Sequence, residues 1–222
     1  MSMQNQPWKR LKDPGSAITH FIALMMTVMG GIPLIFKAVI LQNPLRQFSA
    51  LVYLSSMILL YMASTMYHSL DISETINRRL KKFDHMMISV LIAGSYTPIC
   101  LLTLSPQVGI PLACLVWTMA LGGILLKALW VYCPRWVSSI LYIAMGWTCV
   151  IAFVPLIHAM PIQGFIWLVL GGVIYTIGAV IYALKLPIFH NMTKNFGNHE
   201  LFHLFVMGGS VCHFIVMYSY VY

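Results

Sequence analysis

Charged residues are scarce in this chain of 222 residues, and acidic ones are the scarcest. Only 8% of the residues are charged, with 5 Asp and Glu against 13 Lys and Arg, whereas 60% are hydrophobic. Soluble domains carry about a quarter charged residues. Together with a mean hydropathy of +0.84, this shortage of charge excludes a water-soluble fold.

Cysteine is also sparse, and its placement argues against a cysteine-based site. The chain has 5 cysteines and no C-x-x-C pair among them. All of them fall within hydrophobic stretches or at their ends, where cysteine acts as a small apolar packing residue. We therefore expect neither disulfides nor cysteine metal ligands.

The gaps between charged residues are long enough to cross a membrane. Five stretches contain no charge: 14–36, 47–70, 85–126, 136–184 and 201–222. A bilayer core about 30 Å thick needs about 20 helical residues. The stretches therefore hold one, one, two, two and one spans, and helix breakers near 105–110 and 158–164 divide the two long ones.

The sequence thus predicts an all-α membrane protein, a bundle of seven transmembrane helices. Its uniformly apolar runs do not fit the short alternating strands of a membrane β-barrel. No room is left for a soluble domain, so we expect residues 1–16 to form an N-terminal tail and residues 17–222 a single seven-helix domain. The expected spans are 17–38, 48–69, 84–104, 111–132, 136–157, 164–184 and 198–220.

Basic residues lie mainly on one side of the predicted bundle. The opposite side has only Lys37 and Arg46. Because Lys and Arg are retained in the cytoplasm, we predict a cytoplasmic N-terminus and an external C-terminus. Charges spread over four segments fit anionic lipid headgroups and do not indicate nucleic-acid binding. The basic side carries Lys9, Arg10, Lys12, Arg78, Arg79, Lys81, Lys82, Lys127, Arg135, Lys185 and Lys194.

Polar residues inside the predicted spans are costly and therefore raise the question of a function. Ser64 and His68 lie at the predicted cytoplasmic end of the second span. Asp84 lies at the start of the third span, and His199 and His203 lie at the start of the seventh. Three segments far apart in the sequence thus bring these five residues to one layer.

The spacing of the histidines fits a metal ion. His199 and His203 are four residues apart, so on a helix they share one face. With His68 they would form a three-histidine zinc site with an open fourth position, as in catalytic zinc sites. Asp84 is suited to hold the activated water or accept its proton, and Ser64 lies one turn from His68.

Other interpretations of the same residues stay open. Each histidine could be a hydrogen-bonded packing residue, and a zinc ion could be purely structural. Residues 199–203 also read H-E-x-x-H, the zinc-protease signature, with Glu200 as general base. That interpretation is weaker because the nearest downstream histidine, His213, lies about 15 Å further along the helix.

The remaining histidines give weaker signals. We expect His20 to pack at the inner end of the first span, with support of the metal site as the alternative. His85 is expected at the membrane interface and His213 in a hydrogen bond within the bundle. The other two, His158 and His190, are expected at turns.

Several motifs together resemble a known family. The chain is similar to the bacterial haemolysin III family, within the progestin and adipoQ receptor superfamily that includes the adiponectin receptors. The chain departs from the family pattern at one place: an acidic residue is expected just before the Thr-His motif of the first span, but here the run is Asp13-Pro-Gly. The matching segments are 16–20 (SAITH), 63–68 (ASTMYH), 81–85 (KKFDH), 93–98 (AGSYTP), 144–147 (AMGW), 198–203 (NHELFH) and 209–213 (GSVCH).

The resemblance implies a seven-helix protein of the bacterial inner membrane, with its N-terminus and its zinc site toward the cytoplasm. It implies zinc ligands at His68, His199 and His203, with Asp84 contacting the zinc-bound water and Ser64 supporting the site. The expected function is hydrolysis of lipid amides or esters, similar to a ceramidase, with a membrane lipid as substrate. The alternatives are a non-enzymatic sensor of membrane state with a structural zinc, and a haemolysin-type cytolysin.

Overall fold

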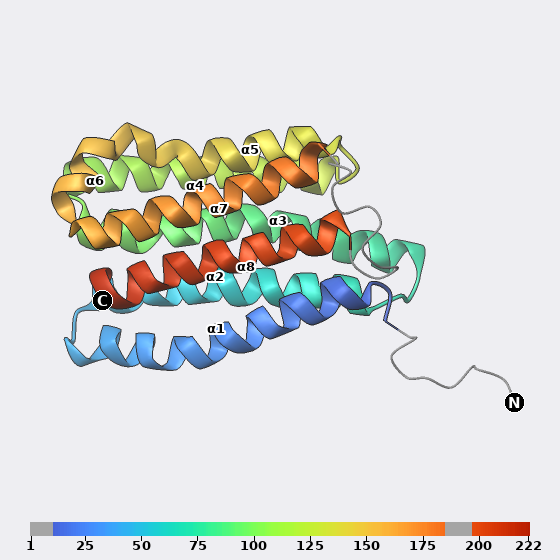
Figure 1. Cartoon of the computed structure of the whole chain (residues 1–222), viewed down its shortest axis with the longest axis horizontal. Coiled ribbons are helices and arrows are strands. Elements are labelled where there is room, and N and C mark those ends of the chain that lie inside the picture. Colours follow the sequence, from blue (N-terminus) through green and yellow to red (C-terminus); the bar gives the residue numbers. More distant parts are fainter. Residues whose placement is uncertain (1–10, 185–196) are drawn as a thin grey trace, which may run out of the picture.

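The computed structural model describes residues 11–184 and 197–222, which are almost entirely helical. Seven of the described helical segments are long and apolar enough to cross a membrane. They run side by side, and α1 begins at the opposite end of the bundle from the C-terminus (Figure 1). The elements are α1 (Pro14–Ile40), α2 (Pro44–Ser69), α3 (Glu74–Pro98), η2 (Ile99–Thr103), α4 (Pro106–Leu129), α5 (Arg135–Trp147), η3 (Thr148–Ala152), α6 (Phe153–Ala159), α7 (Ile162–Leu184), α8 (Asn198–Val216) and η5 (Met217–Val221).

The predicted all-helical bundle is confirmed at the level of seven long apolar helices. The side of the membrane on which each end lies stays a prediction. α1 begins at Pro14, so the last residues of the expected tail 1–16 are helical. Five of the residues used above lie outside the described residues: Lys9, Arg10, Lys185, His190 and Lys194.

The third helix is longer than the sequence predicted. α3 begins at Glu74, whereas the span was expected to start at residue 84. The hydroxyl of Ser73 accepts a hydrogen bond from the backbone N–H of Ile76 at 3.3 Å and so caps the helix. Glu74 in the first turn suits the positive end of the helix dipole. Asp84 therefore lies more than two turns inside α3 instead of at its start.

Two of the predicted spans contain irregular turns that follow or precede a proline. The third span continues from Pro98 into the π-helical η2. The fifth passes from α5 through the 3₁₀ segment η3 into α6, which contains Pro155. Proline lacks the backbone donor that a regular helix needs at that position, so the hydrogen-bonding pattern changes locally.

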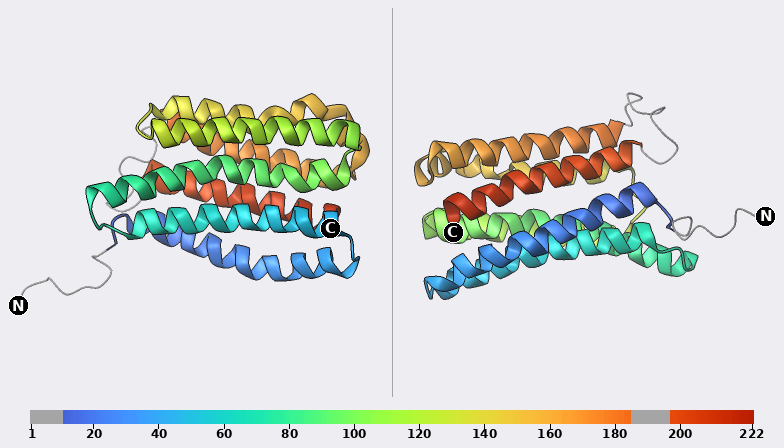
Figure 2. Two further views of the ribbon diagram at one scale, coloured as in Figure 1. Left: turned by 180° about the vertical axis from the view of Figure 1, so that it is seen from behind. Right: turned by 60° about the horizontal axis from the view of Figure 1, so that its bottom comes forward.

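The helices pack so that α8 lies between α7 and α1, while α3 lies between α2 and α4 (Figures 1 and 2). The buried core is apolar, with Tyr53, Leu60 and Tyr61 almost completely covered. Large apolar side chains also cover the outside, and Leu129 and Ile151 are 81% and 74% exposed. An apolar outer surface suits contact with lipid tails.

Paired glycines allow close approach of helices, and in one pair the two members differ sharply. A Cβ atom added to Gly123 in α4 would overlap the hydroxyl of Ser89 in α3. A Cβ atom added to the neighbouring Gly122 would meet nothing within 4 Å. Gly123 therefore faces α3, and Gly122 faces away from the bundle.

This difference predicts unequal effects of the same substitution. Gly123→Leu should lower the free energy of unfolding by about 1–3 kcal/mol, because the side chain overpacks the contact between α3 and α4. Gly122→Leu should leave stability nearly unchanged. Thermal unfolding of both variants in detergent micelles measures the difference, and equal melting temperatures would contradict the assigned packing.

Candidate metal centre and its cavity

Three histidine side chains meet at the end of the bundle where α1 begins. His68 lies in the last turn of α2, whereas His199 and His203 lie one turn apart in the first turns of α8. One ring nitrogen from each lies within 4.8 Å of the others. His68 and His203 are each only 2% exposed. The predicted meeting of the three imidazoles is therefore found, and the cluster could hold a metal ion.

Hydrogen bonds at the Nδ1 atoms determine which nitrogens face the centre. Nδ1 of His68 lies 3.0 Å from a carboxylate oxygen of Asp13. Nδ1 of His203 lies 3.2 Å from the hydroxyl of Thr19. When each Nδ1–H donates to its oxygen, the Nε2 atom keeps its lone pair for a metal. A second hydrogen bond of this kind is typical of histidines that bind metals.

The distance between the free nitrogens also fits a metal. Nε2 of His68 and Nε2 of His199 are 3.1 Å apart. Two nitrogens bound tetrahedrally to zinc at 2.0–2.1 Å lie about 3.3 Å from each other. Among the described residues, the buried Ser64 hydroxyl and both ring nitrogens of His20 have no hydrogen-bond partner. Such unsatisfied polar atoms beside the cluster leave room for a further polar ligand.

Asp84 is buried but belongs to the cavity wall and not to the three-histidine cluster. Its side chain is 6% exposed, and a carboxylate oxygen lies 3.0 Å from Nδ1 of His85. The structure thus pairs His85 with Asp84, and the expected position of His85 at the membrane interface stays a prediction. His85 is partly buried and lines the same cavity as Asp84.

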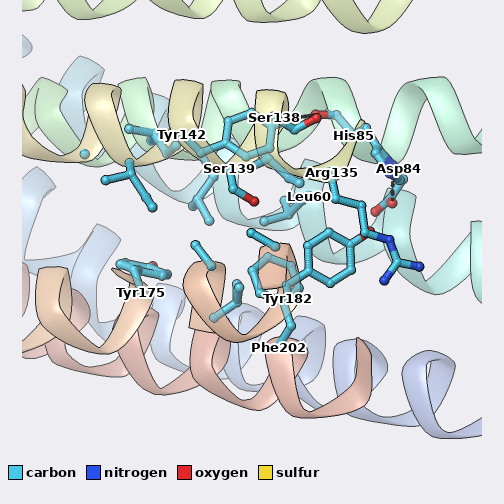
Figure 3. A pocket seen from close by; sticks show the side chains of 18 of the residues that line it. Leu60, Asp84, His85, Arg135, Ser138, Ser139, Tyr142, Tyr175, Tyr182 and Phe202 are labelled. Carbon is cyan, nitrogen blue, oxygen red and sulfur yellow. Dashed lines mark hydrogen bonds and ion pairs between the residues drawn. The ribbon is translucent and has the colours of Figure 1, made fainter. Parts of the chain in front are cut away.

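The cavity beside the cluster has a volume of about 580 Å³ and is lined by all helices from α1 to α8 except the short α6. Ser64, His199 and His203 contribute to one part of its wall. Figure 3 shows side chains of α5, from Ser138 to Tyr142, facing those of α7 and α8 across the cavity. A cavity of this size with mostly apolar walls and a few polar groups is typical of a small-molecule site.

Glu200 does not line the cavity. One of its carboxylate oxygens accepts a hydrogen bond from the hydroxyl of Ser16 at 2.6 Å. The other accepts a hydrogen bond from the backbone N–H of Gly197 at 2.9 Å. Glu200 therefore caps the start of α8 and joins it to α1, which leaves the protease interpretation without a free base.

Sequence reasoning missed two residues that support the cluster, Asp13 and Thr19, and gave a supporting role of His20 only as the alternative. Asp13 and Thr19 hold two of the histidines, and His20 stacks on His203 with 3.6 Å between ring centres. A signal was present: Asp13 is one of only 5 acidic residues and directly precedes a membrane helix. The expected hydrogen bond of His213 is confirmed, since its Nε2 lies 3.3 Å from the carbonyl of Leu168.

Comparison with known proteins identifies the family of the chain. Residues 8–214 match the model of the family described as haemolysin-III related. Hemolysin-3 of Bacillus cereus is 36% identical over 95% of this chain and 92% of its own length. The Hemolysin-3 homolog of Bacillus subtilis is 36% identical over 94% of each chain. The human monocyte to macrophage differentiation factor is 24% identical over 80% of this chain and 72% of its own length. The chain therefore belongs to the haemolysin-III related family.

Proposed function

We propose that this multi-pass membrane protein is a zinc-dependent hydrolase of lipid amides or esters, active in membrane lipid homeostasis. The observation that carries the proposal is the convergence of three imidazoles beside a largely apolar cavity that also contains a buried carboxylate. His68, His199 and His203 would hold the ion. Three neutral imidazoles with an open fourth position form the donor set of many catalytic zinc sites.

Residues of the chain would take separate roles in the proposed hydrolysis. When bound, zinc supplies Lewis acidity, which polarises a carbonyl and lowers the pKa of water to about 7. Asp84 lines the cavity and accepts a proton from the attacking water. The Ser64 hydroxyl, buried and without a partner among the described residues, donates a hydrogen bond to the water or the substrate.

A membrane lipid is the substrate that best suits this cavity. Its walls include apolar side chains of α3 and α5 such as Ile88, Ile92 and Ile143. A lipid can reach a site between membrane helices from the bilayer itself. We further propose that the site opens toward the cytoplasm, because its end of the bundle carries Lys12, Arg78, Arg79, Lys81 and Lys82.

A structural role for the metal is the competing proposal, and one observation favours it. The three histidines come from two helices, α2 and α8, so an ion bound there would fasten these helices together. In a sensor of membrane state, the ion would be needed for stability and no lipid would be cleaved. The name hemolysin given to the bacterial relatives raises cytolysis as a third possibility, which release of haemoglobin from erythrocytes would detect.

Replacement of a proposed ligand should remove the metal. We expect about one zinc ion per chain in the purified protein, and background levels in His199→Ala and His203→Ala. His158 is an exposed histidine in α6, so His158→Ala should keep the full zinc content. Elemental analysis by mass spectrometry gives the ratio. Zinc retained in both ligand variants would contradict the proposed site.

Asp13 should tune the affinity for the metal without being a ligand. Asp13→Asn removes the charged acceptor at Nδ1 of His68, so we expect zinc affinity to fall about 10- to 100-fold. Asp71→Asn is the matched control, because Asp71 is exposed and its carboxylate accepts a hydrogen bond from Asn77. Competition with a fluorescent zinc chelator measures both affinities. Equal affinities would assign Asp13 no part in the site.

A substitution at Asp84 distinguishes the hydrolase proposal from the sensor proposal. Asp84→Asn should keep the zinc and the melting temperature but lower fatty-acid release from lipid amides or esters about 100- to 10,000-fold, because the proton acceptor is lost. Mass spectrometry of lipids incubated with each protein in mixed micelles measures the release. A zinc-loaded wild-type protein that cleaves no lipid class would favour the sensor.

A further inference from the structure

A second group of polar residues lines the same cavity, away from the three-histidine cluster. Lys127 lies in the last turn of α4, where a lysine ordinarily extends to solvent. Here the side chain turns inward and is only 2% exposed. Its ammonium donates hydrogen bonds to Sγ of Cys133 at 3.1 Å and to the hydroxyl of Ser138. Its charge, which the sequence analysis used only to orient the bundle, is therefore directed into the protein.

The partners of Lys127 are a cysteine sulfur and a serine hydroxyl, and no acidic side chain of the chain pairs with its ammonium. All 5 acidic residues lie among the described residues, and none forms an ion pair with Lys127. Asp84 lines the same cavity but lies beside His85. An ammonium buried without a counter-ion is costly in an apolar surrounding. A ligand that carries a negative charge would therefore stabilise the buried ammonium.

The surroundings of Lys127 are suited to an anion. Ser138 and Ser139 belong to the start of α5 and are 6% and 5% exposed. No side chain caps this helix at Pro134, so the positive end of its dipole is not compensated there. Arg135 in the first turn also lines the cavity and adds a second positive charge. The Lys127 ammonium, the two serine hydroxyls and the start of α5 thus all favour an anion in the same region.

An apolar channel leads away from this region. From Ser138 to Trp147 the wall follows α5 for nine residues, or about 14 Å. Ile92 and Tyr96 of α3 and Ile143 of α5 are among the residues that line it. A cavity that is cationic at one end and apolar along its length matches a molecule with an acidic headgroup and a hydrocarbon chain.

We propose that Lys127 and Ser138 bind the acidic oxyanion headgroup, a carboxylate or a phosphate, of an amphiphile whose chain lies along α5. The ammonium supplies the counter-charge and the serine hydroxyl a hydrogen bond. The site uses none of the three histidines, so it does not depend on the proposed hydrolysis.

Calorimetric titration of the purified protein in detergent tests this assignment. The probes are palmitate, a lysophosphatidic acid with a palmitoyl chain, and the neutral palmityl alcohol. We expect the acidic probes to bind at least tenfold more tightly than the alcohol. Equal affinities would overturn the proposal. A preference for the phosphate over the carboxylate, or the reverse, identifies the headgroup, and competition by inorganic phosphate alone would assign a soluble anion as its source.

Substitutions separate the charge of Lys127 from its shape. Lys127→Met should reduce affinity for the acidic probes at least tenfold and leave the alcohol unchanged, whereas Lys127→Arg should keep the preference. Lys82→Met is the matched control, since the Lys82 ammonium donates to the carbonyl of Ala128 and does not line the cavity. Unchanged acid binding in a folded Lys127→Met protein would refute the site.

A further control excludes binding of the acidic probes to zinc at the three-histidine cluster instead of to Lys127. The same titrations are therefore made on zinc-stripped protein and on His199→Ala. Retention of the preference for acidic probes supports the Lys127 site even where hydrolysis is never found. Loss of the preference in both would place the anion on the metal and overturn the proposal. If Lys127→Met does not fold, Ser138→Ala, which keeps the ammonium, should still weaken acid binding several-fold.

Discussion

A polar group buried in an apolar bundle is stable only when it has a partner, and this requirement determines how one end of the molecule is built. Several of these partners come from a distant part of the chain. Asp13, which precedes α1, bonds His68 at the end of α2. Thr19 of α1 lies beside His203 of α8, and Ser16 of α1 bonds Glu200 of the same helix. The start of α1 therefore joins two helices that are distant in sequence.

The same contacts prepare the chemistry of the cluster. A histidine that binds a metal through one nitrogen typically donates its other N–H to an acceptor, which fixes the orientation of the ring. Asp13 and Thr19 provide these acceptors, and the stacking of His20 on His203 restricts that ring further. The supporting interactions lie on regular helices, which position a site more precisely than loops do. One set of hydrogen bonds thus serves both packing and preorganisation.

Features set by residues close together in the sequence could be predicted better than contacts between residues far apart. The long helices follow from charge-free stretches, because membrane thickness converts directly into helix length. The pairing of His199 with His203 follows from helical periodicity, and the basic residues suggested that His68 lies at the same level. The start of α3 was placed at residue 84 because the charged turns of this helix lie before its apolar part.

Contacts between distant side chains were harder to predict. Asp13 was noted only in a run that departs from the family pattern, because its bond to His68 depends on how α1 approaches α2. Lys127 was counted only among the cations of the basic side, because charge position alone does not reveal the direction of a side chain. Burial changes the interpretation of Lys127, because water solvates an exposed ammonium whereas a buried ammonium needs a partner.

The proposed hydrolysis and the proposed binding of an acidic amphiphile both suit the excess of positive charge in the cavity. Lys81, Lys127 and Arg135 line the cavity, whereas Asp84 is its only acidic residue. Hydrolysis of a neutral lipid ester or amide converts an uncharged carbonyl group into a carboxylate. A cavity with excess positive charge stabilises that product more than the neutral substrate. Lys127 would then pair with the carboxylate that hydrolysis creates. Asp84, on the wall of the same cavity, would act as the proton acceptor. Binding of an acidic amphiphile and cleavage of a neutral one are therefore compatible uses of one cavity.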